Sequence, residues 1–141
     1  MKKIGSLHTG LLMIGVLTVS GSLWAHGDVT PQNVDISGLE SLGEEWREEN
    51  PFRNNELAIE IGKSAYAQNC ARCHGLDAIS GGIAPDLREL EPGLEGDEWY
   101  AYRVINGAVR NGVPYMPKMA DFMSQEALWS IRAWLESLPV E

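Results

Sequence analysis

The sequence contains the segment Cys70-Ala71-Arg72-Cys73-His74, which Gly75 follows. Two cysteines three positions apart, with a histidine directly after the second, form the C-x-x-C-H pattern of covalent haem attachment. Positions i, i+3 and i+4 share one face of a helix, so Cys70 and Cys73 can both reach the vinyl groups of one porphyrin. The imidazole of His74 then lies beneath the ring and can ligate the iron. The motif predicts one covalently attached haem c.

Three other chemistries use a C-x-x-C spacing, and the rest of the chain disfavours each. A structural zinc site needs about four nitrogen or sulfur ligands, whereas this chain has two cysteines and three histidines. A thioredoxin-like redox pair belongs in a βαβ setting, but a helical pattern precedes these cysteines. A disulfide is disfavoured because two cysteines this close within a helix cannot easily meet its strict geometry.

Residues 1–25 resemble a secretory signal peptide. Lys2 and Lys3 precede a mostly apolar run over residues 11–24, and Ala25 offers a small residue for cleavage. An uncleaved anchor is the alternative, but the run is shorter than the roughly 20 residues that a spanning helix needs. We therefore expect cleavage, a periplasmic protein and no stable membrane anchor. Covalent haem attachment outside the cytoplasm agrees with this expectation.

The charge of the chain is strongly acidic. The formal net charge is −9, and removal of Lys2 and Lys3 with the leader would make it −11. Residues 26–60 hold nine of the 20 acids and only two bases, Arg47 and Arg53. This balance excludes nucleic acid and anionic membranes as favoured partners. It is compatible with a basic docking patch on a protein partner, or with a role in solubility alone.

The chain after the leader divides into an arm, residues 26–55, and one small domain, residues 56–141. Glycines and prolines interrupt the arm, although residues 44–50 could form one or two helical turns, and Leu39, Leu42 and Trp46 are spaced to pack on the domain. We expect three main helices and almost no sheet. These helices cover residues 56–73, residues 97–107 with Asp97 as N-cap, and a segment after the N-cap Ser124 that ends at Pro139. The predicted fold class is all-α.

A second axial ligand of the iron must come from few candidates. His8 lies in the leader, and His26 would be the new amino terminus, so methionine remains. Met116 follows a turn and lies between two prolines, in a rigid loop that could hold a thioether on the iron. Met119 is the alternative ligand, and an open sixth position is a further one; Met119 and Met123 are otherwise core residues. With His74 and Met116 as ligands, both axial positions of the iron are filled, and the haem is suited to electron transfer.

The chain from residue 56 to residue 138 resembles class I cytochromes c. The similarity includes Gly62 and Tyr66, residues 70–75, Ala84-Pro85-Asp86-Leu87, the Met116-Pro117 pair and Ala133-Trp134-Leu135. The resemblance implies that the first and last helices cross where Gly62 and Tyr66 meet Ile131 and Trp134. It also implies that the Pro85 carbonyl accepts a hydrogen bond from the His74 imidazole and that Leu87 packs on the porphyrin.

A narrower resemblance connects the arm to small periplasmic cytochromes c that accept electrons from quinoprotein (PQQ-dependent) alcohol dehydrogenases. It rests on Thr30-Pro31-Gln32, on residues 42–51, on residues 79–88 and on Tyr115-Met116-Pro117. It implies a monohaem carrier of single electrons, not an enzyme, with such a dehydrogenase as donor and a terminal oxidase or another cytochrome as acceptor. The alternatives are a haem enzyme or gas sensor with an open sixth site, and a fixed cytochrome subunit of a larger dehydrogenase complex.

Overall fold

The computed structural model describes residues 31–139, so the predicted signal peptide and residues 26–30 of the arm lie outside the described residues. The architecture is mostly helical, with α1 (Glu56–Asn69), α2 (Ala71–His74), α3 (Leu94–Asn106) and α4 (Gln125–Ser137). Three short 3₁₀ helices, Leu76–Ala78, Leu87–Glu89 and Met119–Asp121, punctuate the connections. The three longest helices match the expected number, but the fold is not purely α, because it contains a small two-stranded sheet.

Helix α1 begins as predicted and ends earlier than predicted. The Asn55 side chain caps it by accepting a hydrogen bond from the Ala58 N–H at 3.0 Å. The expected helix over residues 56–73 is divided at Cys70, the C-cap of α1, whose φ of −115° departs from regular helix values while the residue stays in the right-handed helical region. The chain resumes as the single turn α2, in which the His74 N–H donates to the Cys70 carbonyl at 3.0 Å. The i, i+3, i+4 geometry of the motif is therefore kept in spite of the break.

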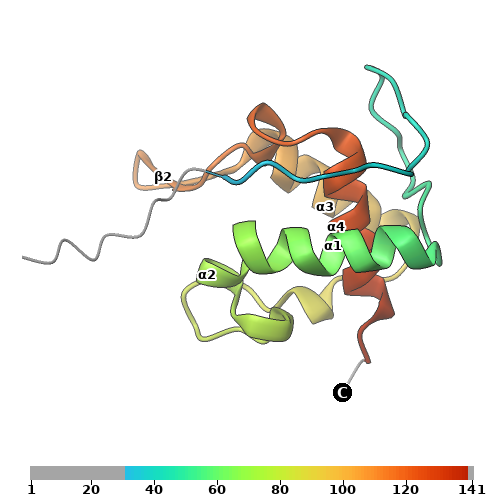
Figure 1. Cartoon of the computed structure of the whole chain (residues 1–141). Coiled ribbons are helices and arrows are strands. Elements are labelled where there is room, and N and C mark those ends of the chain that lie inside the picture. The colour runs from blue at the N-terminus through green and yellow to red at the C-terminus, as the bar shows by residue number, and fades with distance from the viewer. Residues whose placement is uncertain (1–30, 140–141) are drawn as a thin grey trace, which may run out of the picture.

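Helices α1 and α4 cross closely and form the centre of the core (Figure 1). A Cβ atom added at Gly62 would lie 1.9 Å from the Ser130 carbonyl oxygen and 2.9 Å from the Ile131 nitrogen. The backbones touch here, and only glycine permits this approach. One turn further along α1, the Tyr66 ring lies 4.5 Å from the Trp134 ring, centroid to centroid. The crossing implied by the resemblance is confirmed.

Helix α3 begins at Leu94, three residues before the predicted start, after Gly93 with φ of 72°. The prediction that Asp97 caps this helix is wrong, because Asp97 lies inside the first turn and is fully buried. Its carboxylate accepts hydrogen bonds from Arg132 Nε at 2.8 Å, from the Asn50 N–H at 2.8 Å and from Arg53. A buried carboxylate needs such partners, and here they join the arm, α3 and α4.

The turn predicted at residues 111–114 connects two short strands that the sequence analysis did not predict. Strands β1 (Ala108–Arg110) and β2 (Val113–Met116) pair antiparallel, with Val109 opposite Pro114. Asn111 and Gly112 have φ of 52° and 77°, the positive values that tight two-residue hairpin turns require. The hairpin ends at Met116, so the position of this residue is fixed by the strand pairing.

The arm packs across α4 and is fixed there by side chains of the first turn of that helix. Ser124 caps α4 as predicted, accepting from the Ala127 N–H at 3.3 Å. Glu126 Oε1 accepts from the Leu42 N–H at 2.8 Å, and Gln125 Nε2 donates to the carbonyls of Gly43 and Glu45. Leu42 is buried, and Leu39 and Trp46 pack against the core, as expected. The suggested helical turns at residues 44–50 do not form.

Within the part of the chain that the structure describes, none of the helices has the length and apolar character needed to cross a membrane.

Candidate haem site

The two cysteines and the histidine of the motif lie on one helical turn at the end of α1. Both thiols are free, Cys70 is half-buried and Cys73 is exposed. Burial, with a smaller contribution from the neighbouring Cys73, raises the pKa of the Cys70 thiol to about 12. Among residues 31–139 no group of three or more histidine, cysteine or acidic side chains is arranged to hold a metal ion. The zinc and disulfide interpretations therefore have no support in the described part of the molecule.

The imidazole of His74 is oriented by a backbone carbonyl. Its Nδ1 atom lies 2.9 Å from the carbonyl oxygen of Pro85. A carbonyl can only accept, so the proton of the neutral ring resides on Nδ1 and the lone pair on Nε2. Nε2 is then the atom available to a metal, and the bond to Pro85 fixes the plane of the ring. The hydrogen bond implied for Pro85 by the resemblance is present.

The loop that carries Pro85 is held by its own hydrogen bonds. The Ser80 hydroxyl donates to the Ala84 carbonyl, and the Ser80 N–H donates to Asp86 Oδ2 at 3.2 Å. Arg88 forms a two-point contact with Asp86, from Nε at 3.0 Å and from NH2 at 2.9 Å. The Arg88 side chain, assisted by backbone N–H donors, holds the pKa of Asp86 well below its usual range. Asp86 thus stays ionised, and the Pro85 carbonyl keeps its place beside His74.

Met116 lies at the end of β2 and is tied to the same loop. Its neighbour Tyr115 donates a hydroxyl hydrogen bond to the Ile83 carbonyl, two residues before Pro85. The backbone of Met116 rests against Gly107, where an added Cβ would lie 2.5 Å from the Met116 oxygen. In Figure 1, α2 and β2 are found at the same end of the molecule. One loop therefore joins the segments of His74 and Met116.

The three methionines of this region differ in burial. Met116 is half-buried, whereas Met119 and Met123 are only 5% and 6% exposed and belong to the core. The expectation that Met119 and Met123 serve as core residues therefore agrees with their positions. Met116 retains surface that a ligand can reach.

Exposed apolar side chains are present on the segments that carry or adjoin His74 and Met116. They come from the segments after His74 and from the hairpin, which are linked through Tyr115 and Ile83. The most exposed of them are Leu76, Ile79, Ile83, Val109 and Val113. A porphyrin is a flat, largely apolar ring, and burying apolar surface stabilises a protein by about 25 cal/mol per Å². Two thiols, an imidazole, a thioether and an apolar lining are the donor set and the surroundings that haem c requires.

Four side chains of the kinds that can bond haem propionates, Arg88, Arg110, Trp99 and Tyr102, each have a protein partner in the structure. Arg88 pairs with Asp86, and Arg110 lies 5.3 Å from the Tyr115 ring. The Trp99 and Tyr102 rings stack with centroids 6.2 Å apart. The guanidinium of Arg103, which the sequence analysis did not single out, lies 4.3 Å above Trp99. A basic residue four positions after a tryptophan in a helix was the available signal for this stack.

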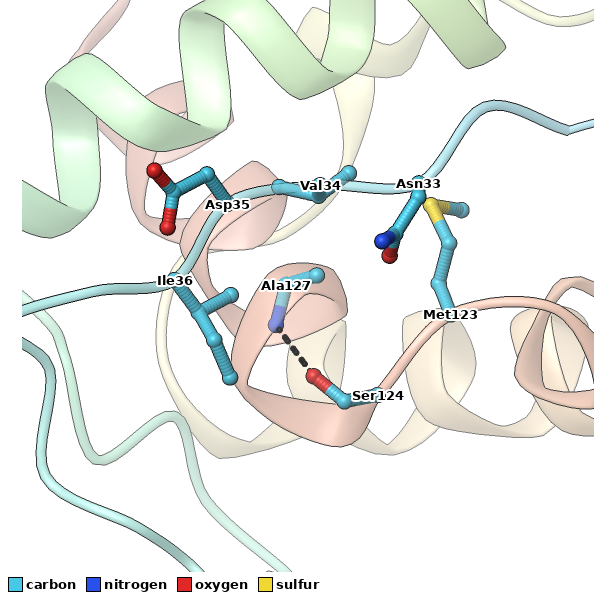
Figure 2. A pocket seen from close by; sticks show the side chains of 7 residues that line it. All are labelled: Asn33, Val34, Asp35, Ile36, Met123, Ser124 and Ala127. Atoms are coloured by element: carbon cyan, nitrogen blue, oxygen red, sulfur yellow. Dashed lines mark hydrogen bonds between the residues drawn. The ribbon is translucent and has the colours of Figure 1, made fainter.

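A pocket elsewhere on the molecule contains none of the predicted site residues. It lies between the arm and the start of α4 and is lined by Asn33, Val34, Asp35, Ile36, Met123, Ser124 and Ala127 (Figure 2). Figure 2 shows the arm passing over the first turn of α4, beside the bond between Ser124 and Ala127. The pocket belongs to the junction of arm and helix.

Comparison with known proteins supplies the relatives of this chain. A family model described as cytochrome c oxidase, cbb3-type, subunit III, matches residues 57–135. Cytochrome c550 of Pseudomonas aeruginosa is 65% identical over 136 residues, an alignment that covers 94% of each chain.

Two longer proteins are similar over part of their length. The quinohemoprotein alcohol dehydrogenase ADH-IIG of Pseudomonas putida is 37% identical over 82 residues, which span 58% of this chain and 11% of that enzyme. Its solved structure superimposes with a TM-score of 0.51 at 31% identity, covering 70% of this chain and 14% of the enzyme chain. The cbb3-type cytochrome c oxidase subunit FixP of Rhizobium meliloti is 30% identical over 89 residues, 59% of this chain and 31% of that subunit.

Proposed function

The chain belongs to the cytochrome c family and carries a covalently bound haem c; from this premise we propose that Cys70 and Cys73 attach the haem and that His74 and Met116 ligate its iron. Haem iron supplies reversible one-electron chemistry when it is bound in this way. The observation that carries the proposal is the bond of His74 Nδ1 to Pro85, because it uses Nδ1 and leaves Nε2 as the nitrogen that a metal could take. His74 thus acts as an oriented ligand instead of a core histidine.

The protein residues have complementary tasks in this proposal. Cys70 and Cys73 fix the position of the ring through two thioether bonds. His74 and Met116 would both ligate the iron, and this would keep substrates and small gases from it. A thioether ligand favours the reduced iron and raises the reduction potential. We therefore assign the protein the role of an electron carrier that makes and breaks no substrate bonds, and electrons pass at the edge of the ring.

The proposed site of action is the bacterial periplasm. Supporting this are the pattern of Lys2, Lys3 and the following apolar run, typical of a cleaved secretory signal, and the oxidising, extracytoplasmic setting of covalent haem attachment. The corresponding division of the chain is a signal peptide at residues 1–25, an arm at residues 26–55 and a haem domain at residues 56–141.

The proposed electron donor is a quinoprotein alcohol dehydrogenase, and the proposed acceptor is a terminal oxidase or another cytochrome. The similarity to part of a quinohemoprotein alcohol dehydrogenase supports the choice of donor, because the name of that enzyme joins a quinone, a haem and alcohol dehydrogenation in one protein. The similarity to an oxidase subunit supports the choice of acceptor class. In both proteins the matched part is a fraction of a longer chain, which keeps a fixed-subunit role as the second candidate.

Stopped-flow reduction of the purified holoprotein tests the donor. The oxidised protein is mixed with a quinoprotein alcohol dehydrogenase and its alcohol, and haem absorbance is followed. We expect reduction that is saturable in enzyme and that requires both enzyme and alcohol. An NAD-dependent alcohol dehydrogenase with the same alcohol serves as the control and should give no reduction. Equal rates with the two enzymes, or no reduction by any quinoprotein enzyme, would contradict the assignment.

Size-exclusion chromatography of a native periplasmic extract distinguishes a free electron carrier from a fixed subunit of a dehydrogenase complex. The carrier should elute at the size of a single small chain, detected by its haem absorbance. Elution only together with a large dehydrogenase would favour the fixed subunit.

A further inference from the structure

Residue Tyr66 contacts both ends of the C-x-x-C-H segment. Its backbone carbonyl accepts the Cys70 N–H at 2.8 Å, where the segment begins. Its side-chain hydroxyl donates to the Gly75 carbonyl at 2.8 Å, directly after His74. Tyr66 lies in α1, one helical turn before the C-x-x-C-H segment, and it contacts the backbone at both ends of that segment. The resemblance described above places Tyr66 only in the helix crossing and gives its hydroxyl no task.

Helix α2 needs an external restraint of this kind. It has four residues, and so short a helix is not stable by its own hydrogen bonds. Its last N–H bond is the one from Gly75 to the Ala71 carbonyl at 2.9 Å. The Gly75 carbonyl points the other way, out of the helix, and is satisfied by Tyr66. Residue Gly75 is thereby held at both its backbone N–H and its backbone carbonyl.

Steric contact allows Gly75 little freedom. Its φ is 84°, and an added Cβ would lie 1.8 Å from the Ile79 carbonyl oxygen. The Tyr66 ring is equally constrained: the side chain is 1% exposed and packs on Trp134 of α4. Burial raises the pKa of the Tyr66 hydroxyl above its usual range, so the hydroxyl keeps its proton and remains a donor. The hydrogen bond from the Tyr66 hydroxyl to the Gly75 carbonyl therefore joins two groups that have little freedom to move.

We propose that Tyr66 is a positioning residue for the axial ligand His74: its hydroxyl fixes the Gly75 peptide, and with Pro85 on the imidazole it sets the orientation of the His74 ring toward the iron. This inference rests on the proposed function, because it takes His74 as an iron ligand. Loss of the hydroxyl frees the Gly75 carbonyl, and the backbone of His74 gains a rotation that the bond to Pro85 alone does not prevent. Ring orientation and the strength of the ligand bond then change.

The test compares Tyr66→Phe with Tyr100→Phe in the holoprotein. Tyr100 is a suitable control because it is also buried and donates its hydroxyl to a backbone carbonyl, that of Leu128 at 2.7 Å. Both variants lose one hydrogen bond and keep the ring, so their melting temperatures should fall by similar amounts. We expect only Y66F to shift the midpoint potential and the paramagnetically shifted NMR resonances of the His74 ring. Equal values in Y66F, Y100F and the unchanged protein would overturn the proposal, as would equal shifts in both variants.

Proton exchange in the unchanged protein provides a second test, which does not require that the variants fold. The hydroxyl proton of Tyr66 should exchange slowly with water and give its own NMR resonance, whereas fast exchange would overturn the proposal. The unchanged protein also separates this inference from its premise. Absence of a covalent, low-spin haem with histidine bound would refute the proposed function itself. A normal low-spin haem with unaffected Y66F would refute only the role of Tyr66.

Discussion

Met116 and Met119 lie three residues apart but in different surroundings. Met116 ends β2 beside Tyr115 and is half-buried, whereas Met119 is buried in the core. A thioether is a weak ligand that depends on being held in place. The hairpin, the Gly107 contact and the bond from Tyr115 to Ile83 hold the Met116 segment in this way.

Replacement of Met116 by alanine should open the sixth coordination position. The reduced M116A holoprotein is expected to bind carbon monoxide rapidly, visible as a shift of the haem absorption bands, and to have a lower reduction potential. The measurement is a carbon monoxide titration followed by absorption spectroscopy.

Met119→Ala is the matched control for that experiment. It should leave the sixth position closed while lowering the free energy of unfolding by about 2–5 kcal/mol, the usual cost of truncating a buried methionine. If M119A binds carbon monoxide and M116A does not, Met119 is the ligand.

At the residue scale, the sequence predicted the attachment motif, and the family resemblance added one of its supports, the bond from His74 to Pro85. Cys70, Cys73 and His74 follow from spacing alone, because one helical turn determines their geometry. The bond to Pro85 joins residues eleven positions apart, and it could be expected only from family resemblance. The Tyr66 hydroxyl bond had no signal, since packing on Trp134 already accounts for an aromatic residue there.

The crossing of α1 and α4 is the element-scale feature that most constrains a single residue. Gly62→Ala should lower the free energy of unfolding by about 3 kcal/mol or more, because the new methyl group would overlap the Ser130 carbonyl and force the helices apart. Chemical denaturation of the holoprotein measures this loss. Gly81→Ala is the control, since a Cβ at Gly81 meets no atom within 4 Å. A stable G62A would show that the two backbones do not touch.

The junction of the arm with α4 should depend on pH through Glu126. Burial opposes its ionisation, but hydrogen bonds from the Leu42 N–H, its own backbone and Ser124 outweigh this and lower the pKa of Glu126. A lowered folded-state pKa means that the stabilisation is complete above the unfolded value of about 4.3 and is lost as the pH falls through the folded value.

Hydrogen exchange of the Leu42 amide measures this dependence. Protection should be constant near neutral pH, after correction for intrinsic exchange, and should fall in acid below about pH 4. In Glu126→Gln the protection should be weaker and independent of pH over this range. Unchanged protection of Leu42 at low pH in the original protein would contradict the role given to Glu126.

At the scale of elements, the sequence located the helices but not all their ends. Asn55 and Ser124 cap their helices because their side chains face free backbone N–H groups, and of these two caps Ser124 was predicted. Asp97 has the same chemistry, yet it is used in the interior to pair with Arg132. Local sequence cannot distinguish these roles, because the partner lies 35 positions away. The short strands β1 and β2 were missed for a similar reason, since only their turn has a distinctive sequence.

At the scale of the whole molecule, the acidic charge should control encounters with partners. The exposed glutamates of the arm, such as Glu44, contribute to an excess of negative charge over residues 26–60. If the donor presents a basic surface, the second-order rate of reduction should fall several-fold between about 0.05 and 0.5 M salt, because screening shortens the range of attraction.

Two charge-reversal variants test whether the arm is the part of the surface that attracts the electron donor. Glu44→Lys should slow reduction at low salt more than Glu98→Lys, an equal change of charge on an exposed residue of α3. Both variants should react alike at high salt. A rate that does not depend on salt would leave the charge with a role in solubility only, and equal slowing by the two variants would contradict a special role for the arm.

The most direct test of the account is exposure of the reduced holoprotein to carbon monoxide at neutral pH. The central claim is a closed electron-transfer centre, with His74 and Met116 on the two sides of one covalently attached haem. The account predicts an absorption spectrum that carbon monoxide does not change on the time scale of mixing. Rapid formation of a carbon monoxide complex would show an open sixth position and would contradict the carrier.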